Sequence, residues 1–238
     1  MSARPALGLM LALGIVGAPF ALAMASSLGV SSQNLTPYRT CTITATPAAT
    51  TVVRDASVRQ GLPNTNFGAT TTSNVASGNG LNRRLYVRFD LTVCAPAIPS
   101  TATVRLATLR AYLTGVPAVC RTIDIFPVTA AWTETAITWN NQPFGTAINN
   151  PPSGSRTGFF SVGTPIGCQN RVTGAYLVGA IVTSDVAAQV AGSATNFGWM
   201  LRDDVEGSGT TRTVTVSAKE LGAVAQAPQL VVTYVEQP

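Results

Sequence analysis

The feature of this sequence that most constrains its fold is an alternation of apolar and polar residues with a period of two. Between Arg84 and Leu91 every second residue is large and apolar, beginning with Leu85, while Tyr86 and Arg88 fall between them. Side chains of a strand point alternately to its two faces, so this pattern is typical of a strand with one buried and one solvent-facing side. The sequence therefore predicts a half-buried strand at residues 84–91.

Similar short segments recur along the chain, separated by Gly, Pro and Asn residues. One segment, Ser184–Ala191, instead has helical spacing, with Ser184 or Asp185 as its cap and Val186 and Val190 on one face. Many short strands without alternating long helices predict an all-β fold, an antiparallel β-sandwich of the jelly-roll type with one short capping helix. The further strands are expected at Thr103–Leu106, Leu109–Thr114, Thr122–Val128, Phe159–Val162, Gly198–Arg202, Arg212–Ala218 and Gln229–Val235.

Residues 1–25 have the features of an export signal. Arg4 precedes an apolar run at Leu7–Phe20, and small residues suited to cleavage follow before Ser26. An uncleaved membrane anchor is the alternative, although three glycines and Pro19 weaken a spanning helix. We expect cleavage, no stable membrane insertion afterwards, and a secreted, extracellular or cell-surface protein.

The rest of the chain divides into two parts. Residues 26–50 are rich in Ser, Thr, Ala and Pro and have no clear period, which predicts a tether or an irregular first segment. Residues 51–238 are numerous enough for one sizeable core. We expect them to form a single β-sandwich domain, and we expect a monomer.

Four cysteines form an even set without the Cys-x-x-Cys spacing of metal sites, so two disulfides are expected in an exported chain. Three pairings are possible. Because Cys94 and Cys120 flank the hairpin-like segment Ala102–Leu113, we predict a bond between them, which leaves Cys41 for Cys168.

Basic residues outnumber acidic ones by 15 to 10, and all of them except Lys219 are arginine. This excess is too small and too dispersed for a nucleic-acid interface. It fits a shallow basic face for an acidic polysaccharide. A bias in genome composition is the other explanation.

The chain has no histidine, which excludes Ser/His/Asp and Cys/His triads and His-bearing zinc sites. Two carboxylates would suffice for a glycosidase, but no two of the ten acidic residues pair convincingly in the sequence. The densest acidic cluster, Asp203, Asp204 and Glu206, predicts either a structural Ca²⁺ loop or an ordinary hairpin turn. We expect no other cofactor.

Two of the three tryptophans lie within the segment Trp132–Pro143. Beside Asn140 and its neighbouring amides, an indole ring can serve as a platform for sugars, or it can fill the core at an open end of the sandwich. Polar residues suited to satisfying backbone groups in an irregular crossover favour the second interpretation for Trp132 and Trp139.

Arginines around residues 84–91 are the best candidates for a binding face. Arg84 and Arg88 project from the same side of the predicted strand as Tyr86, so cations and an aromatic ring would share one surface. With Arg59 and Arg83 nearby, this surface suits carboxylated sugars. A solvated outer face, with Arg88 paired to an acid, is the alternative.

Several motifs, in this order, resemble the bacterial DNRLRE domains, which are grouped with carbohydrate-binding module family 96. The resemblance extends from about Val52 to Val235. It rests on Asn64–Gly68, Asn82–Asp90, Trp132–Glu134, Ile137–Pro143, Asn196–Trp199, Asp203-Asp204 and Pro228–Tyr234.

The resemblance implies a jelly-roll sandwich on a secreted or cell-surface protein. Relatives bind acidic polysaccharide, notably alginate, through basic side chains, which in this chain correspond to Arg59, Arg83, Arg84 and Arg88. It makes Trp132, Trp139, Asn140 and Trp199 signature residues of the fold. With one lysine, the chain differs from the alginate binders.

Three functions follow from these patterns. The first is a non-catalytic module that binds a polysaccharide, possibly an acidic one. The second is a structural or adhesive protein of the cell surface or extracellular matrix. The third, a polysaccharide lyase or hydrolase, has the least support because no acid and base pair is visible.

Overall fold

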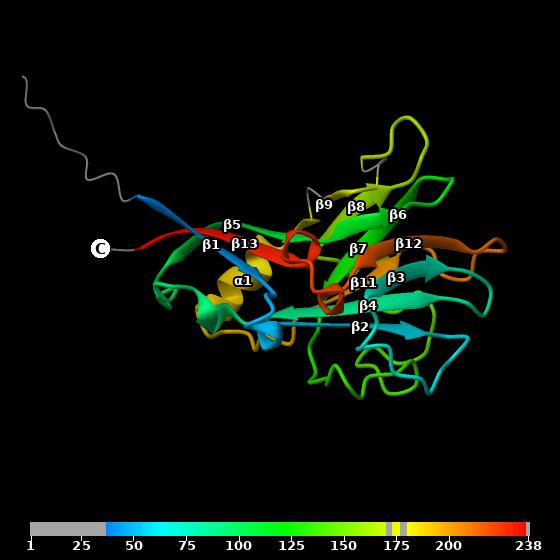
Figure 1. Cartoon of the computed structure of the whole chain (residues 1–238), viewed down its shortest axis with the longest axis horizontal. Helices are drawn as coiled ribbons and strands as arrows, with labels where there is room; N and C mark the ends of the chain where they lie inside the picture. The colour runs from blue at the N-terminus through cyan, green and yellow to red at the C-terminus, as the bar shows by residue number, and fades with distance from the viewer. Residues whose placement is uncertain (1–36, 170–172, 177–179, 237–238) are drawn as a thin grey trace, which may run out of the picture. The chain divides into compact units, whose positions relative to one another are not determined.

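A computed structural model describes residues 37–169, 173–176 and 180–236, and these lie in one compact unit. The strands form two antiparallel sheets, and one short α-helix lies among them (Figure 1). The predicted antiparallel β-sandwich with one short helix is therefore confirmed. The predicted export signal, residues 1–25, lies outside the described residues, as do residues 26–36.

The smaller sheet has the order β1-β13-β5-β10 and the larger one β8-β7-β11-β4-β3-β12-β6-β9, with β2 paired to β4. The strands are β1 (Tyr38–Thr44), β2 (Val53–Arg59), β3 (Thr72–Ser77), β4 (Arg83–Phe89), β5 (Thr103–Arg110), β6 (Tyr112–Gly115), β7 (Arg121–Pro127), β8 (Gly158–Val162), β9 (Ala175–Tyr176), β10 (Ala180–Ile181), β11 (Trp199–Asp203), β12 (Arg212–Ser217) and β13 (Gln229–Val235). The helices are α1 (Thr183–Val190) and the 3₁₀ turns η1 (Thr50–Val52), η2 (Leu91–Val93), η3 (Ser153–Ser155), η4 (Lys219–Leu221) and η5 (Val224–Gln226). No helix in the described part of the chain is long and apolar enough to span a membrane.

The first strand of the smaller sheet was missed from the sequence. Residues 38–44 were expected to be irregular, but they form β1, which pairs with β13 along its whole length. Most of its side chains are exposed or half-buried, and only one edge of β1 has a partner. Such a strand needs no apolar alternation, and so the pattern gives no signal for it.

The helix α1 lies close to its predicted position but begins differently. Its first flanking residue is Val182, and neither Ser184 nor Asp185 makes the predicted side-chain cap. Asp185 instead accepts hydrogen bonds from Thr157 Oγ1 at 3.1 Å and from Trp199 Nε1 at 2.7 Å. Val186 is buried in the main core, and Val190 packs against the same cluster, as the predicted apolar face requires.

Two hydrophobic clusters lie on opposite faces of the larger sheet. The main cluster contains residues from both sheets, including Leu85 and Val87 of β4 and Leu230 of β13. The second contains Ala56, Tyr86 and Met200 together with Trp132, Ile137 and Trp139 from the irregular segment between β7 and β8. We call residues 128–157 the crossover; it runs below β2 and β4 in Figure 1.

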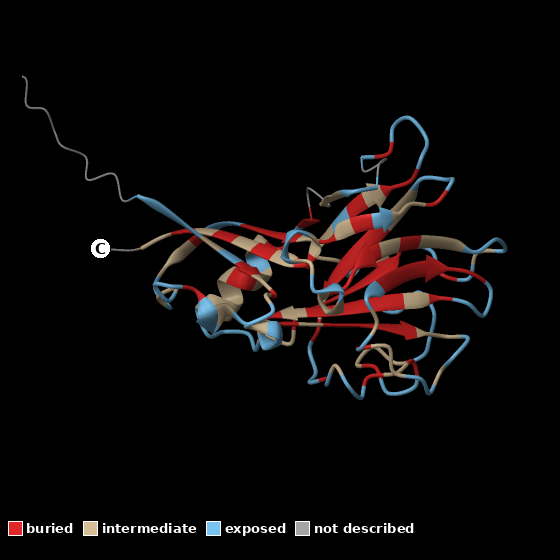
Figure 2. Cartoon of the chain, in the orientation of Figure 1, coloured by how far each residue is buried: buried red, intermediate tan, exposed pale blue. Residues whose placement is uncertain are grey.

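Because the crossover covers the outer face of the sheet, β4 is buried on both sides (Figure 2). The prediction of a half-buried strand at residues 84–91 is therefore wrong. The alternation is real, but Arg84 and Tyr86 face a second core and not solvent.

The predicted disulfide pairing is also wrong: the bonds join Cys41 to Cys94 and Cys120 to Cys168, not Cys94 to Cys120 and Cys41 to Cys168. Residues 103–110 do not turn back as a hairpin; they form one continuous strand paired with β13. Cys120 and Cys168 instead flank the antiparallel pair of β7 and β8, and Cys41 lies on β1.

Candidate functional site

Arg84, a predicted binding residue, is fully buried and uses all five of its N–H donors inside the protein. Its Nε and Nη2 donate to the two carboxylate oxygens of Glu206, each at 2.8 Å. The remaining donors bond Gln142 Oε1 at 3.2 Å and the carbonyls of Gly145 and Ala147 at 3.0 and 2.6 Å. The side chain therefore holds the crossover and the β11–β12 connection against β4, and it has no donor left for a ligand.

Tyr86 is likewise enclosed. Its hydroxyl donates to Gln142 Oε1 at 3.0 Å, its ring packs edge-on against Trp132, and its pKa is raised mainly by burial. The prediction that Arg84 and Tyr86 form part of a glycan surface is contradicted by their burial.

The three tryptophans are buried, which supports the core interpretation. Trp132, Trp139 and Trp199 are 8%, 3% and 0% exposed, respectively. The sequence suggested that Trp132 and Trp139 fill an open end of the sandwich. They instead cover the outer face of the larger sheet. Asn140, the fourth predicted signature residue, is exposed, and its side chain donates to Asn64 Oδ1 at 2.7 Å.

The predicted calcium residues do not share a site. Glu206 is paired with Arg84, whereas Asp203 and Asp204 both contact Arg121. Burial raises the pKa of Asp203, and the hydrogen bonds from Arg121 oppose that shift. Both oxygens of Glu206 and Asp203, and one oxygen of Asp204, bond arginines. The three carboxylates thus anchor a strand connection, and a calcium ion held by them stays a prediction.

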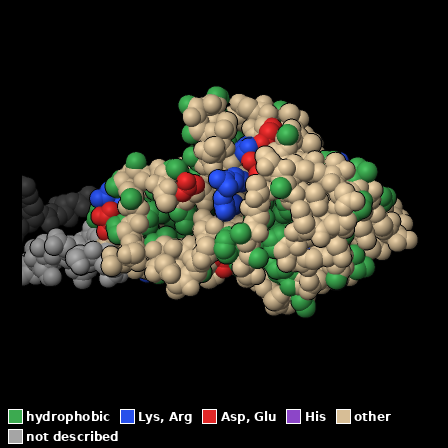
Figure 3. Space-filling model, turned by 90° about the horizontal axis from the view of Figure 1, so that it is seen from below, with side chains coloured by type: hydrophobic (Ala, Val, Ile, Leu, Met, Phe, Trp, Pro, Cys, Tyr) green, Lys and Arg blue, Asp and Glu red, His purple; other side chains and the backbone are tan. Residues whose placement is uncertain are grey.

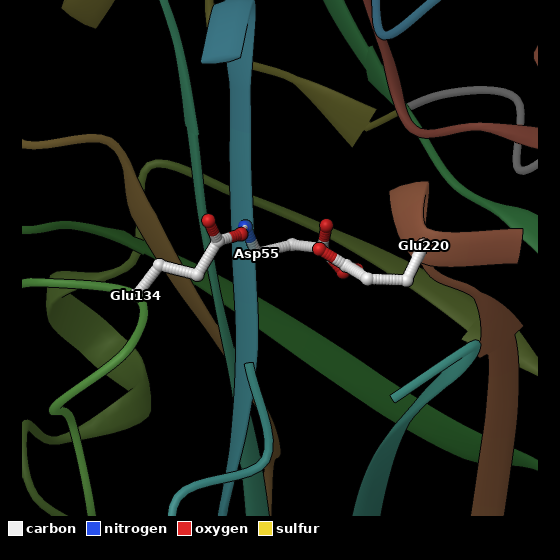
Figure 4. Close-up of side chains that lie close together, drawn as sticks. All are labelled: Asp55, Glu134 and Glu220. Carbon is white, nitrogen blue, oxygen red and sulfur yellow. Dashed lines mark hydrogen bonds between the residues drawn. The ribbon is translucent and has the colours of Figure 1, made fainter. Parts of the chain in front are cut away.

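Three other carboxylates do lie close together in the described part of the chain. Oxygen atoms of Asp55, Glu134 and Glu220 lie within 4.8 Å of one another, and Figure 4 shows Asp55 between the two glutamates. Lys219 Nζ lies 3.1 Å from Glu134 Oε1 and is also bonded to Glu220. The ammonium group therefore already supplies a positive charge to this cluster, which joins β2, the crossover and η4.

Asp55 is held without a direct bond to that ammonium. Its Oδ1 accepts the backbone N–H of Lys219 at 3.2 Å, and its Oδ2 accepts Ser73 Oγ at 3.3 Å. Burial first, and then the charge of Glu220, raise the pKa of Asp55 from 3.8 to about 7. Burial also raises the pKa of Glu134.

Arg59 and Arg83, also predicted, are brought together by the structure. They are register partners at one end of the β2–β4 ladder. Together with Leu62 and Leu81, which are half-exposed, they line a small hollow of about 130 Å³. Burial and the neighbouring charge of Arg83 lower the pKa of Arg59, whose guanidinium stacks 3.8 Å from the centre of the Phe67 ring.

A second arginine pair lies at the other end of the same ladder. Arg88, which was predicted, is the register partner of Arg54, which was not. Burial and the charge of Arg54 lower the pKa of Arg88. The two arginines line a hollow of about 370 Å³ with Asp90, Gln189 and Asn196.

Sequence reasoning missed Arg54 because β2 itself was missed. In β2 the buried positions include Asp55 and Ser57, so the apolar pattern that reveals a strand is interrupted. Cross-strand pairing, and not proximity in sequence, selects Arg54 as the neighbour of Arg88.

Part of the sequence matches a known protein family. Residues 46–163 match the family model of carbohydrate-binding module family 96, a segment that runs from before β2 to the end of β8. The match contains both arginine pairs and the whole crossover, and it ends before Trp199 and Asp203. No curated protein matches the chain. Through residues 46–163, the chain belongs to carbohydrate-binding module family 96.

Proposed function

We propose that this protein is an exported, non-catalytic module that binds an acidic polysaccharide on the β2–β4 ladder. Family membership supports carbohydrate as the ligand class. The acidic nature of the ligand is supported by one observation. At each end of the ladder an arginine of β2 lies opposite an arginine of β4: Arg54 opposite Arg88, and Arg59 opposite Arg83.

Like charges directly opposite each other in a sheet are destabilising. Several arginines elsewhere do have a counter-charge: Arg84, Arg121 and Arg156 each form an ion pair with a carboxylate. None of the four ladder arginines forms such a pair with a described residue. An oxyanion from outside the protein would supply the missing counter-charge, and guanidinium groups bind carboxylate or sulfate with two hydrogen bonds.

Two further parts of the proposal rest on separate observations. Export is supported by the two disulfides, which are typical of oxidising compartments. The absence of catalysis is supported by the matched family, which is one of binding modules. We also propose a monomer, which sedimentation of the mature protein would test.

Affinity electrophoresis in gels containing acidic or neutral polysaccharide tests the proposed ligand class. We expect the wild-type protein to be retarded by acidic polysaccharide and less so at higher salt, because screening weakens exposed charge interactions. We expect the apparent affinity to fall about tenfold in each of two double variants, Arg59→Ala/Arg83→Ala and Arg54→Ala/Arg88→Ala.

The matched control is Arg105→Ala/Arg212→Ala. It removes the same charge from β5 and β12, at residues that line neither hollow. Equal losses in this control and in the ladder variants would show that net charge alone is responsible. Equal retardation by neutral polysaccharide, or none by any acidic one, would contradict the proposal.

A further inference from the structure

A second hollow of different chemistry adjoins the one beside Arg54 and Arg88. The second hollow, of about 340 Å³, is lined by Val128, Thr129, Asp185, Thr195 and Phe197 among others. Gln189 of α1 lines both. Each volume lies within the range of about 300–1,000 Å³ that is usual for ligand pockets.

Charge separates the two hollows. The first contains two arginines and Asp90, whose pKa is lowered mainly by the hydrogen bond from Thr92. Its net charge of about one positive unit suits a single oxyanion. On the face drawn in Figure 3, the largest group of basic side chains lies near the middle, and acidic side chains are scattered over the rest of the face.

No Lys or Arg is among the residues that line the second hollow. Its only charged residue is Asp185, and the rest of its wall is made of small, apolar and hydroxyl side chains. A second oxyanion placed there would face a carboxylate without a counter-charge, which is unfavourable. A neutral sugar ring fits better, since its C–H faces can pack on Phe197 and its hydroxyls can bond Thr129 and Thr195.

Gln189 stands where the two hollows meet and carries an unused acceptor. Its Oε1 is buried and has no hydrogen-bond partner among the described residues. That oxygen is closed to solvent, so a sugar hydroxyl can donate to it only after the side-chain amide rotates toward the hollows. The junction is therefore suited to the link between two successive sugar residues.

We propose that these adjoining hollows form a two-residue subsite for a glycan in which an acidic sugar is next to a neutral one. The inference rests on the proposed function and narrows its substrate class: polymers charged on every residue should bind less well. It also extends the binding site beyond the family match, because Gln189, Thr195 and Phe197 follow residue 163. The oxyanion can be a carboxylate or a sulfate ester.

Calorimetric titration of the mature protein with oligosaccharides of equal length tests the proposal. Hyaluronan fragments carry a carboxylate on alternate residues, κ-carrageenan fragments carry a sulfate on alternate residues, and polygalacturonate fragments carry a carboxylate on every residue. We expect at least one alternating ligand to bind about tenfold more tightly than polygalacturonate, and Arg54→Ala/Arg88→Ala to lose at least tenfold in affinity for it. Whether hyaluronan or carrageenan is preferred distinguishes carboxylate from sulfate.

A gain-of-function variant makes the test independent of loss of folding. Thr129→Lys places a cation in the second hollow and should improve polygalacturonate binding about tenfold, whereas Thr114→Lys, an exposed position on β6 outside both hollows, should not. Tighter binding of polygalacturonate by the wild-type protein would overturn the inference. So would full affinity of Arg54→Ala/Arg88→Ala when Arg59→Ala/Arg83→Ala has lost binding, although the proposed function would then stand. If no acidic glycan binds, both proposals fall.

Discussion

Adjacent arginines in this chain have opposite roles because a strand directs them to opposite faces. Arg83 is partly exposed, whereas Arg84 points into the second core and carries a buried ion pair with Glu206. The partially exposed arginine is available to a ligand, and the buried one holds the crossover on the sheet.

Removal of either partner of the buried pair should be strongly destabilising. We expect Arg84→Met or Glu206→Gln to lower the free energy of unfolding by about 3–5 kcal/mol, because each leaves an uncompensated buried charge. Arg83→Met should change it by about 0.5 kcal/mol or less. Urea denaturation of the purified variants measures all three values.

The double variant Arg84→Met/Glu206→Gln provides the control. It leaves no unpaired charge, and so its loss should be smaller than the sum of the two single losses. Simple additivity would show that the pair contributes no coupling energy.

Asp55 should make the stability depend on pH in the opposite sense to an ordinary paired carboxylate. Its pKa is raised from 3.8 to about 7, and the charged groups facing it are Glu134, Glu220 and Lys219. Between these pH values the unfolded chain has released the proton that the folded chain still holds. The free energy of unfolding should therefore fall as the pH rises, by about 1.4 kcal/mol per pH unit for this one proton.

Thermal or urea denaturation between pH 4.5 and 7 measures this dependence. Asp55→Asn, which keeps an acceptor for the Lys219 N–H, should flatten most of the slope, while the raised pKa of Glu134 leaves a remainder of the same sign. Asp90→Asn is the matched control, because the pKa of Asp90 is lowered and its titration lies at more acidic pH. A slope that survives in Asp55→Asn but not in Asp90→Asn would refute the assignment.

At the scale of elements, β1 depends on its disulfide more than on burial. Most of its side chains reach solvent, only β13 pairs with it, and Cys41 ties it to Cys94 across 53 positions. Closing a loop of that length contributes about 4 kcal/mol in the chain-entropy treatment.

We expect Cys41→Ala/Cys94→Ala to lose about this free energy of unfolding and to show faster hydrogen exchange in β1. The matched variant Cys120→Ala/Cys168→Ala removes a bond that closes a similar span of 48 positions, and it should lose a similar free energy of unfolding. Its faster exchange should appear at β7 and β8 instead. Slow exchange of β1 in the first variant would show that β13 alone holds it.

The tetrapeptide Thr-Asn-Phe-Gly occurs twice, at Thr65–Gly68 and Thr195–Gly198. It shows how far local sequence can determine local structure. In both copies the Asn Oδ1 accepts the N–H of the Gly two residues later at 3.1 Å, and its Nδ2 donates to carbonyls of another segment. Both glycines lack room for a Cβ, which would lie 2.2 Å from Glu134 O at Gly68 and 2.1 Å from Val87 O at Gly198. The turn chemistry could be predicted from the sequence, but not the segments against which each copy packs.

For the molecule as a whole, the sequence predicted the architecture from strands with an uninterrupted pattern, such as β12 and β13. It failed at β2, where Asp55 and Ser57 occupy buried positions. Those polar residues are stabilised by partners distant in sequence, Lys219 and Asn74, and a local pattern carries no information about such partners.

The candidate site could be predicted only in part, for a related reason. Residues 83, 84 and 88 are equally basic in the sequence, and the difference among them arises from the crossover, which covers Arg84 and leaves Arg88 in a hollow. Which residues a long irregular segment covers depends on tertiary packing. Arg54 became visible as a site residue only through the register of β2 with β4.

The pairing of β1 with β13 also has a mechanical consequence. Tyr38 and Val235 are register partners, so the chain enters and leaves the described unit at points about 5 Å apart. Tension applied through the two ends would open the β1–β13 pairs one at a time, and not shear them together. The disulfide to Cys94 would stop β1 from being pulled out beyond Cys41, after the three pairs that begin at Tyr38, Arg39 and Thr40. Under load, the N-terminal end of the domain would thus extend by a short, fixed length and then hold.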